Sequence, residues 1–267
     1  SDVYKRQEQI FQDCVDFTKR PVFLGEGGAC TLTLCYLSGM VKMERVSDYV
    51  LRPLAQDEAL ARCGTPRQAM EEMMGGALYN LSAAERTTLD EAAFDLVAGW
   101  CLLFFPGESA VLSLFVGTEE KRSISSPSNE TVLKGSRDAF VESLRTNTSI
   151  VRRHLKAPEL RIREQVVGRQ SVTSVDILYI EGLTNPHLVE QVAAQLADID
   201  IDAVLATGNI EEYIVPAART AFPLVQYTER SDRFCAGLAE GRVGILIDGL
   251  PLGYLAPGVL GDFLQAP

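Results

Sequence analysis

The chain has 267 residues, of which 46% are hydrophobic and 23% charged, and these values exclude a low-complexity disordered chain. Its formal net charge of −11 argues against binding of the whole chain to nucleic acid or to an anionic membrane. The longest uncharged run, residues 27–41, is shorter than the roughly 20 apolar residues that a membrane-spanning helix needs, and the chain opens without an apolar secretory segment.

The charge is unevenly distributed along the chain. Residues 1–118 carry a net −6, residues 119–166 carry +3 and residues 167–267 carry −8. Two acidic segments therefore flank a basic one. We predict an N-terminal α/β subdomain over residues 8–118, a basic linker with an amphipathic helix over 119–166, and a C-terminal α/β subdomain over 167–267.

Apolar runs and helical periodicity predict the elements of both subdomains. In the first, we expect strands at 31–37, 101–105 and 111–116, and helices at 46–54, 65–78 and 83–98. In the second, we expect strands at 174–180, 203–206 and 243–247, and helices at 187–197, 210–217 and 232–240. Strands that alternate with helices predict an α/β fold, and glycines placed where hairpins could close favour mixed sheets.

The two subdomains resemble each other in sequence. The run 32–40, with Tyr36 and Gly39, matches the run 175–183, with Tyr179 and Gly182, at an offset of 143 residues. A second match aligns residues 96–107 with 238–249 at an offset of 142. Two matches at nearly one offset indicate a tandem duplication of one α/β unit. The shared glycines predict turns and helix caps with positive φ.

The segment between the subdomains has its own pattern. Residues 121–135 are polar and rich in serine, which favours a linker or an exposed hairpin. Apolar residues then recur at the spacing of one helix face, at Phe140, Leu144, Val151 and Leu155. Basic residues recur on a neighbouring face, at Arg145, Arg152 and Lys156. This face is either a solvated edge or a docking surface for an acidic segment or a partner subunit.

Motifs for catalysis or metal binding are weak. With only two histidines, His154 and His187, a histidine-rich metal site is excluded and a histidine-dependent triad is disfavoured. The glycines at 25, 27 and 28 lack the helix that a dinucleotide motif requires, so we expect a plain turn. The aspartates at 198, 200 and 202 lack the glycine and glutamate of a calcium loop. The six cysteines contain no Cys-x-x-Cys and predict reduced, buried thiols. We therefore expect no metal, no cofactor and no enzyme activity.

A run of motifs resembles a known family. The first is Gly135-Ser-Arg-Asp-Ala-Phe-Val-Glu-Ser-Leu-Arg-Thr-Asn147, followed by residues 150–155. Further matches in the same order lie at 36–39, 50–54, 167–168, 175–182, 228–230, 240–242 and 248–249. Together they resemble the N-terminal region of GerA-type spore germinant receptor A subunits over about residues 13–257. The chain departs from the family at Ser136 and Ala139, where proline and glycine are common, and at Ser126-Pro127, where Glu-Pro is common.

The resemblance implies a cytoplasmic region of two α/β subdomains, followed in the whole protein by a bundle of membrane helices. Such subunits assemble in the inner spore membrane, sense nutrients such as amino acids or sugars, and are thought to form an ion-conducting assembly. It thus implies a role in receptor assembly and in the signal that triggers ion release. We expect this region on the spore-core face of that membrane, with the proline- and glycine-rich end at 249–267 as a tether. The first seven residues resemble a translated sequencing adapter and carry no expectation.

The motif and the basic face together supply candidate interface residues. These are Arg137, Glu142, Arg145, Asn147, Arg152, Arg153 and Lys156. The partners implied are other subunits of the receptor and copies of this chain, with membrane contact only through the absent C-terminal part and no nucleic acid. The alternative from a different class is a bilobal module that binds a small molecule in a cleft between the subdomains.

Overall fold

A computed structural model describes residues 10–24, 30–77, 82–117, 138–199 and 225–257. Several predicted features lie outside these residues. They are the turn at 25–28, the linker at 121–135, Arg137, the aspartates at 200 and 202, the strand at 203–206, the helix at 210–217 and the tether beyond residue 257. The chain divides into two compact units, with 1–120 and 156–158 in unit 1, and 121–155 and 159–267 in unit 2.

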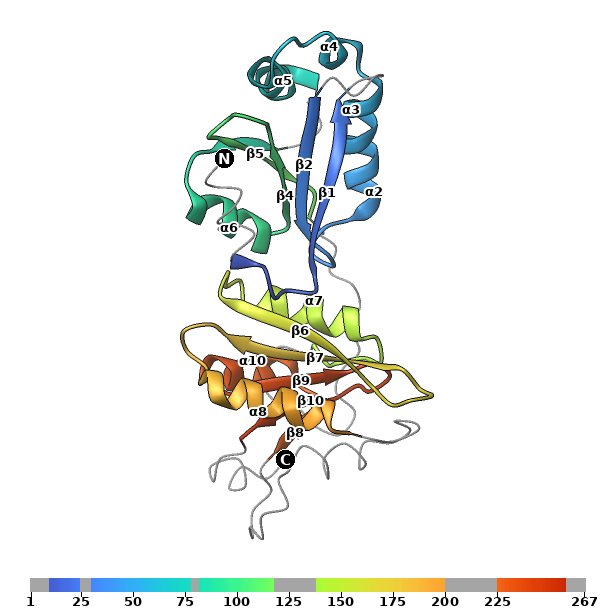
Figure 1. The fold of residues 1–267 in the computed structure, drawn as a ribbon, viewed down its shortest axis with the longest axis vertical. Coiled ribbons are helices and arrows are strands. Elements are labelled where there is room, and N and C mark those ends of the chain that lie inside the picture. The colour runs from blue at the N-terminus through green and yellow to red at the C-terminus, as the bar shows by residue number, and fades with distance from the viewer. Residues whose placement is uncertain (1–9, 25–29, 78–81, 118–137, 200–224, 258–267) are drawn as a thin grey trace. The chain divides into compact units, whose positions relative to one another are not determined.

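Unit 1 contains a five-stranded sheet in the order β1-β2-β4-β5-β3 (Figure 1). Its strands are β1 (Phe17–Leu24), β2 (Cys30–Leu37), β3 (Ala83–Arg86), β4 (Trp100–Phe104) and β5 (Val111–Phe115). Its helices are α2 (Met43–Val46), η1 (Ser47–Leu51), α3 (Arg52–Gln56), α4 (Glu58–Ala61), α5 (Pro66–Glu72), η2 (Met73–Ala77) and α6 (Leu89–Val97). Apolar side chains alternate along β2, so that both faces of the sheet pack against buried clusters.

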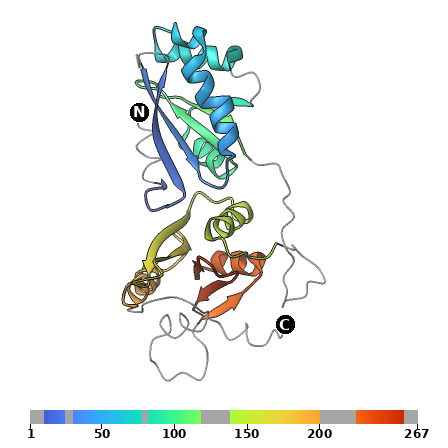
Figure 2. The same cartoon turned by 90° about the vertical axis from the view of Figure 1, so that its right-hand side faces the viewer.

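Unit 2 contains a second five-stranded sheet, in the order β6-β7-β9-β10-β8. Its strands are β6 (Leu160–Val167), β7 (Thr173–Ile180), β8 (Gln226–Thr228), β9 (Val243–Ile247) and β10 (Gly253–Ala256). The described helices are α7 (Leu144–His154), α8 (Pro186–Ala197) and α10 (Ser231–Ala239). α8 packs on one face of this sheet, and α7 and α10 pack on the other (Figure 2).

The prediction of two tandem, duplicated α/β subdomains is confirmed. The sheet orders match strand for strand, and the pairing register repeats. Phe17 pairs with Leu37 in the first sheet, as Leu160 pairs with Ile180 in the second, both at an offset of 143. From β4 and β9 onward the offset is 142, since Thr33 pairs with Phe104 and Asp176 with Leu246. The repeat glycines also agree, with φ of 89° at Gly99 and 86° at Gly241.

Two expectations about the elements were wrong. Every strand pair among the described residues is antiparallel, whereas we expected mixed sheets. The edge strands β1 and β6, which the prediction did not include, form antiparallel pairs with β2 and β7. The helix predicted at 83–98 begins only at Leu89, because Thr88 caps it and Ala83–Arg86 pairs with β5 as a strand.

The continuous helix formed by α2, η1 and α3 contains a π-helical turn, whereas its counterpart in unit 2, α8, is regular. The backbone N–H of Arg52 bonds to the carbonyl of Ser47, five residues earlier. Pro53 follows directly, and proline lacks an N–H and crowds the carbonyl four residues before it. The wider π turn accommodates this ring while Val46, Val50 and Leu54 all remain buried against the sheet.

The segment predicted as a separate basic connector, 119–166, contributes α7 and β6 to unit 2, and its residues 156–158 are grouped with unit 1. β6 pairs with β7 along eight residues, so it is an integral edge strand of the sheet. Its sequence alternates apolar and polar residues, which is the pattern of a half-covered strand. The strand was not predicted because Arg161 and Arg163, which occupy its polar positions, were assigned to the basic connector.

The two units fill equivalent core positions with different volumes. In unit 2, Phe234 of α10 packs on the bare backbone of β9 and β10, where a Cβ added at Gly244 or Gly253 would lie within 2.5 Å of the ring. The equivalent residues of unit 1 are Ala92 on the helix and Leu102 and Val111 on the strands, all in one buried cluster. Unit 1 thus combines a small helix residue with large strand residues, whereas unit 2 combines a large helix residue with glycines on the strands.

This exchange predicts coupled effects on stability. Phe234→Ala leaves a cavity and is expected to cost about 3–5 kcal/mol, and Gly244→Leu overpacks the site at a cost of about 1–3 kcal/mol. The double variant recreates the pair found in unit 1, so its cost is expected to fall below the sum of the single costs by about 1–3 kcal/mol. Urea unfolding of the four proteins measures the coupling. Additive costs would contradict the proposed complementarity.

Candidate functional site: the α7 segment and its partners

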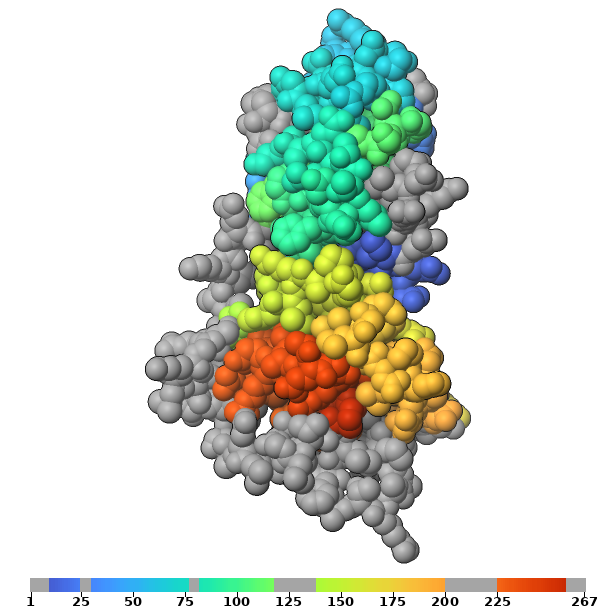
Figure 3. Space-filling view, turned by 90° about the vertical axis from the view of Figure 1, so that its left-hand side faces the viewer, coloured from blue at the N-terminus to red at the C-terminus, as the bar shows by residue number. Residues whose placement is uncertain are grey.

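The seven predicted interface residues lie in different environments. Arg137 lies outside the described residues. Glu142, Arg153 and Lys156 are exposed, and the side chain of Arg145 is 45% exposed. Asn147 and Arg152 are fully buried. The structure therefore brings Glu142, Arg145, Asn147, Arg152 and Arg153 together on and just before α7, but it directs only some of them to the surface. Residues of this stretch, lime to yellow in the space-filling view, reach the molecular surface (Figure 3).

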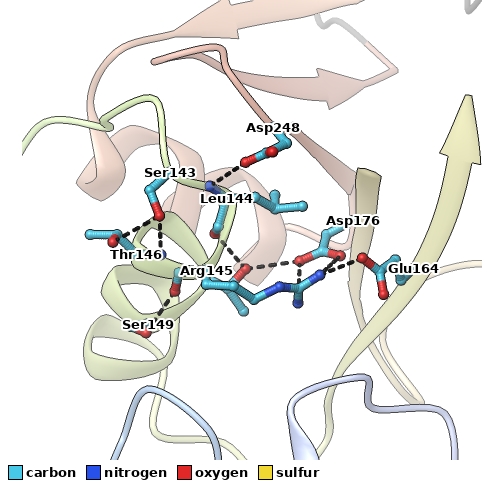
Figure 4. A network of polar contacts seen from close by, with 9 residues as sticks. Ser143, Leu144, Arg145, Thr146, Ser149, Glu164, Asp176 and Asp248 are labelled. Carbon is cyan, nitrogen blue, oxygen red and sulfur yellow. Dashed lines mark hydrogen bonds and ion pairs between the residues drawn. The ribbon is translucent and has the colours of Figure 1, made fainter. Parts of the chain in front are cut away.

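The start of α7 is fixed by its own cap and by a distant carboxylate. Ser143 precedes the helix, and its hydroxyl accepts a hydrogen bond from the backbone N–H of Thr146. The backbone N–H of Leu144 donates to Oδ1 of Asp248, 3.1 Å away and 104 residues later in the chain (Figure 4). A carboxylate at a helix N-terminus also interacts favourably with the helix dipole. Asp248 thereby ties the helix to the end of β9.

Asn147 closes the turn that leads into the helix. Its Oδ1 accepts from the N–H of Val141 at 2.8 Å, and its Nδ2 donates to the carbonyl of Val141 at 2.6 Å. The amide side chain of Asn147 thus satisfies both the N–H and the carbonyl of Val141. Backbone polar groups in a turn that is shielded from water need such partners. We predicted Asn147 as a partner-binding residue, and the structure gives it this internal role.

Arg145 pairs with two carboxylates of the sheet (Figure 4). Its Nη1 and Nη2 lie 3.2 and 3.3 Å from the two oxygens of Asp176 on β7, and Nη2 lies 2.6 Å from Oε1 of Glu164 on β6. The Thr148 hydroxyl lies 2.9 Å from Asp176 and also 2.9 Å from the carbonyl of Leu144. Asp176 is fully buried, so these contacts supply the cation and the donor that a buried carboxylate needs.

The predicted basic edge of Arg145, Arg152 and Lys156 does not exist as a continuous surface. Arg152 lies one turn beyond Thr148 on the side that faces the sheet, and its Nη1 donates to the carbonyl of Leu160 at 3.0 Å. Lys156 lies beyond the end of the helix at His154. The spacing of charges alone placed Arg152 on the solvated side, whereas the buried stripe also includes the polar residues Asn147 and Thr148.

A serine, a histidine and an aspartate also meet at the other end of α7, but not as a catalytic triad. Nε2 of His154 lies 3.2 Å from Oγ of Ser231 and 3.4 Å from Oδ2 of Asp138. A triad needs the carboxylate on Nδ1 and the hydroxyl on Nε2, whereas both partners here share one nitrogen. Ser231 is fully buried, and its hydroxyl donates to the backbone carbonyl of Asp138 at 2.7 Å. The three residues therefore join the ends of α7 and α10.

The sequence motifs that carried the resemblance converge around α7. The N–H of Phe140 bonds to the carbonyl of Glu229 at 2.9 Å, which links the motif at 135–147 to that at 228–230. The N–H of Gly249 bonds to the carbonyl of Glu142 at 2.8 Å, which links it to the motif at 248–249. Phe140 also packs edge-on against Phe234 with ring centroids 5.3 Å apart. These motifs therefore build one structural junction from segments about 100 residues apart.

Electrostatic shifts near this junction have local causes. Arg230 donates to both oxygens of Asp232 at 3.0 and 2.6 Å, and this contact lowers the pKa of the Asp232 carboxyl. Burial raises the pKa of the Cys235 thiol to about 12, so this group stays protonated. Neither group combines a free nucleophile with a base, so the junction has no catalytic arrangement of these residues.

Sequence reasoning missed the acidic partners. Asp176, Glu164 and Asp248 were not among the predicted residues. The signal was present for Asp176, because it is a single charge inside the apolar run predicted as a buried strand at 174–180. A carboxylate in such a strand requires a cation nearby. No comparable pattern identified Glu164, which lies between Arg163 and Gln165, and the motif at 248–249 included Asp248 without indicating its role.

Other kinds of site are weak in the residues that the structure describes. These residues contain no group of three or more His, Cys, Asp or Glu arranged to hold a metal ion. None of their helices is long and apolar enough to span a bilayer. An open depression of about 450 Å³ lies on unit 1 between α4 and α5, lined by Ala59, Arg62, Cys63, Gln68, Glu71 and Glu72. Its charged side chains include ion pairs on the solvent-facing surface, such as Arg62 with Glu58.

The ion pair at α7 predicts a large loss of stability when its cation is removed. Arg145→Ala leaves the buried Asp176 carboxylate without its guanidinium. We expect the free energy of unfolding to fall by about 3 kcal/mol, the lower end of what breaking a buried ion pair costs, because the Arg145 side chain is itself 45% exposed to water. Arg153→Ala, an exposed change on the same helix, is expected to cost less than about 0.5 kcal/mol. Urea unfolding followed by far-UV circular dichroism measures both. The single tryptophan, Trp100, reports unit 1 separately. Equal stability of the two variants would contradict the assignment.

Comparison with known proteins identifies the family. The family model described as Bacillus/Clostridium GerA spore germination protein matches residues 5–267. The chain is 34% identical over 257 residues to the uncharacterized membrane protein YfkQ of Bacillus subtilis, covering 96% of this chain and 49% of that protein. It is 32% identical to spore germination protein KA of Bacillus subtilis, covering 94% of this chain and 45% of that protein. The chain thus spans about half the length of these relatives.

A solved structure agrees with this result. The crystal structure of the N-terminal domain of the A subunit of the Bacillus megaterium spore germinant receptor GerK3 matches with a TM-score of 0.73 and 27% identity. The match covers 96% of this chain and 94% of that domain, so both units and the α7 junction are included. The resemblance inferred from the motifs is confirmed: the chain belongs to the GerA family of spore germination proteins, and its fold is that of the N-terminal domain of a germinant receptor A subunit.

Proposed function

We propose that this chain is the N-terminal domain of a nutrient germinant receptor subunit, and that it acts in receptor assembly and in transmitting the signal that triggers ion release and germination. The observation that carries this proposal is the match to the GerK3 A-subunit domain over nearly the whole of both chains. The junction around α7 supports a scaffolding role, because its polar groups bind one another rather than an open cavity. The domain is not an enzyme in this proposal and requires no cofactor.

The proposed partners are other subunits of the receptor and copies of this chain. Arg145, Asn147 and Arg152 are engaged inside unit 2. The exposed members of the predicted set, Glu142, Arg153 and Lys156, are therefore the described residues that we propose for partner contact. Their mixture of charges suits a salt-sensitive contact that guides assembly more than it adds affinity.

The proposed location is the spore-core face of the inner spore membrane. A relative is named a membrane protein, and this chain spans about half of that relative. We propose that the remaining part of the whole protein lies in the membrane and supplies the membrane contact. The net charge of −11 supports the absence of a nucleic-acid partner.

Germination of spores that carry the full-length gene tests the proposal. Spores with the gene deleted are expected to lose the nutrient response of this receptor, measured as ion release and loss of refractility. Arg153→Glu with Lys156→Glu is expected to weaken both the response and the co-isolation of the other subunits. Arg20→Glu with Arg62→Glu, two exposed reversals in unit 1, is the matched control and is expected to behave as wild type.

Two outcomes would contradict this proposal. Normal nutrient responses in the deletion strain would remove the receptor function altogether. Unchanged co-isolation in the Arg153 and Lys156 double variant would remove these residues from the interface while leaving the receptor function standing. Calorimetric titration of this chain with nutrient germinants tests the bilobal alternative, because saturable binding to the isolated chain would favour ligand capture over assembly.

A further inference from the structure

The residues that α7 buries differ in kind from those of α8, the helix on the opposite face of the unit 2 sheet. Seven of its residues are buried, and four of these are polar: Asn147, Thr148, Ser149 and Arg152. α8 buries four residues, all of them apolar: Val189, Val192, Ala193 and Leu196. Apolar burial stabilises by about 25 cal/mol per Å², whereas exchanging water for protein partners gives a polar group little net gain. The other three buried residues of α7 are Leu144, Ile150 and Val151, so α7 owes a larger share of its contact to polar groups than α8 does.

The ion pair at the centre of this contact adds specificity rather than strength. Asp176 is fully buried and Arg145 is half exposed, so docking α7 removes much of the hydration of both. The cost of that desolvation offsets most of the attraction between the charges. When α7 leaves the sheet, both groups regain water, and no unpaired charge stays buried. Leu144 and Val151 are the apolar anchors of the helix in the cluster beneath it.

The two ends of α7 are also held by polar contacts. Asp248 accepts from the backbone N–H of Leu144 at the first turn, and His154 lies 3.4 Å from Asp138 at the last. Water can replace each of these partners. Opening of α7 would therefore replace its polar contacts by water, and it would also expose Leu144, Val151 and the apolar residues of the sheet that they cover.

Unit 1 shows that the sheet itself does not need this charge. The residue of β2 that is equivalent to Asp176 is Thr33, which pairs with Phe104 as Asp176 pairs with Leu246. The same strand order and register form there with a neutral, half-buried side chain. The buried carboxylate of unit 2 is therefore a feature of the α7 contact and not a requirement of the fold.

We propose that α7 is a reversibly docked helix, which opens from the unit 2 sheet through the Arg145–Asp176–Glu164 ion network while the sheet stays folded. Resting on the proposed function, this opening is the step by which unit 2 passes a signal during germination. The buried charges then serve to keep two arrangements close in free energy, a role that an apolar contact of the same shape could not fill.

Hydrogen exchange of this chain tests the opening without reference to germination. Backbone amides of α7 are expected to exchange at least tenfold faster than those of β7, β9 and α8, and several-fold faster again in 1 M salt, which screens the partly exposed network. In Arg145→Met with Asp176→Leu, which replaces the pair by apolar residues, α7 exchange is expected to slow towards that of the sheet. Equal protection of α7 and β9 in the wild type, or no response to salt, would overturn the proposal.

A milder variant keeps the test decisive if the double variant does not fold. Glu164→Gln removes one carboxylate from Arg145 at the exposed edge of the network. It is expected to speed exchange of α7 several-fold while leaving β9 unchanged. An unchanged α7 rate in this variant would count against the ion network as the contact that controls opening.

Germination separates this inference from the proposed function. Spores with the Arg145→Met and Asp176→Leu pair are expected to respond to nutrient at least tenfold more slowly, although the chain is as stable as wild type. The matched control is Arg86→Met with Asp95→Leu, which replaces the buried ion pair between β3 and α6 of unit 1, and a near-normal response is expected. A normal response in both double variants would overturn the α7 device alone. Failure of the wild-type gene to restore any response would instead overturn the receptor function.

Discussion

The buried carboxylate of Asp176 is the constraint around which unit 2 is arranged. A charge in the middle of a sheet requires a cation and hydrogen-bond donors close by, and α7 supplies them as Arg145 and Thr148. Placing Arg145 there determines the rotation of α7, which in turn directs Asn147 and Arg152 inward. The helix start must then lie beside Asp248, and the preceding turn beside Val141. One charge on β7 thus sets the course of a segment that spans several motifs.

The duplicated architecture was predictable because it depends on apolar periodicity and on glycine geometry. Tyr36-x-x-Gly39 and its copy at Tyr179-x-x-Gly182 mark equivalent turns, and the structure repeats them with the same handedness of backbone. The antiparallel direction was not predictable from these runs. The edge strands β1 and β6 were missed as well, because charged residues interrupt their apolar runs.

The candidate site was predictable only in part. The motif and charge pattern identified the correct segment, because Arg145, Asn147 and Arg152 all contribute to the junction. Their roles could not be read from the sequence, since the partners Asp176 and Asp248 lie 31 and 104 residues from the groups that they bind. A pairing over such separations is determined by strand order. The sequence pattern of α7 alone therefore favoured a surface role for Arg152, which the sheet in fact covers.

The two cores that arose by duplication can no longer exchange parts. A helix with Phe234 fits strands with Gly244 and Gly253, whereas a helix with Ala92 fits strands with Leu102 and Val111. A recombination event that copied one helix over the other would bring a phenylalanine against leucine, or an alanine against bare backbone. Either product is expected to lose stability, because one overpacks the core and the other leaves a cavity. The mismatch in volume therefore protects the two repeats from being made identical again, and leaves each free to acquire its own role.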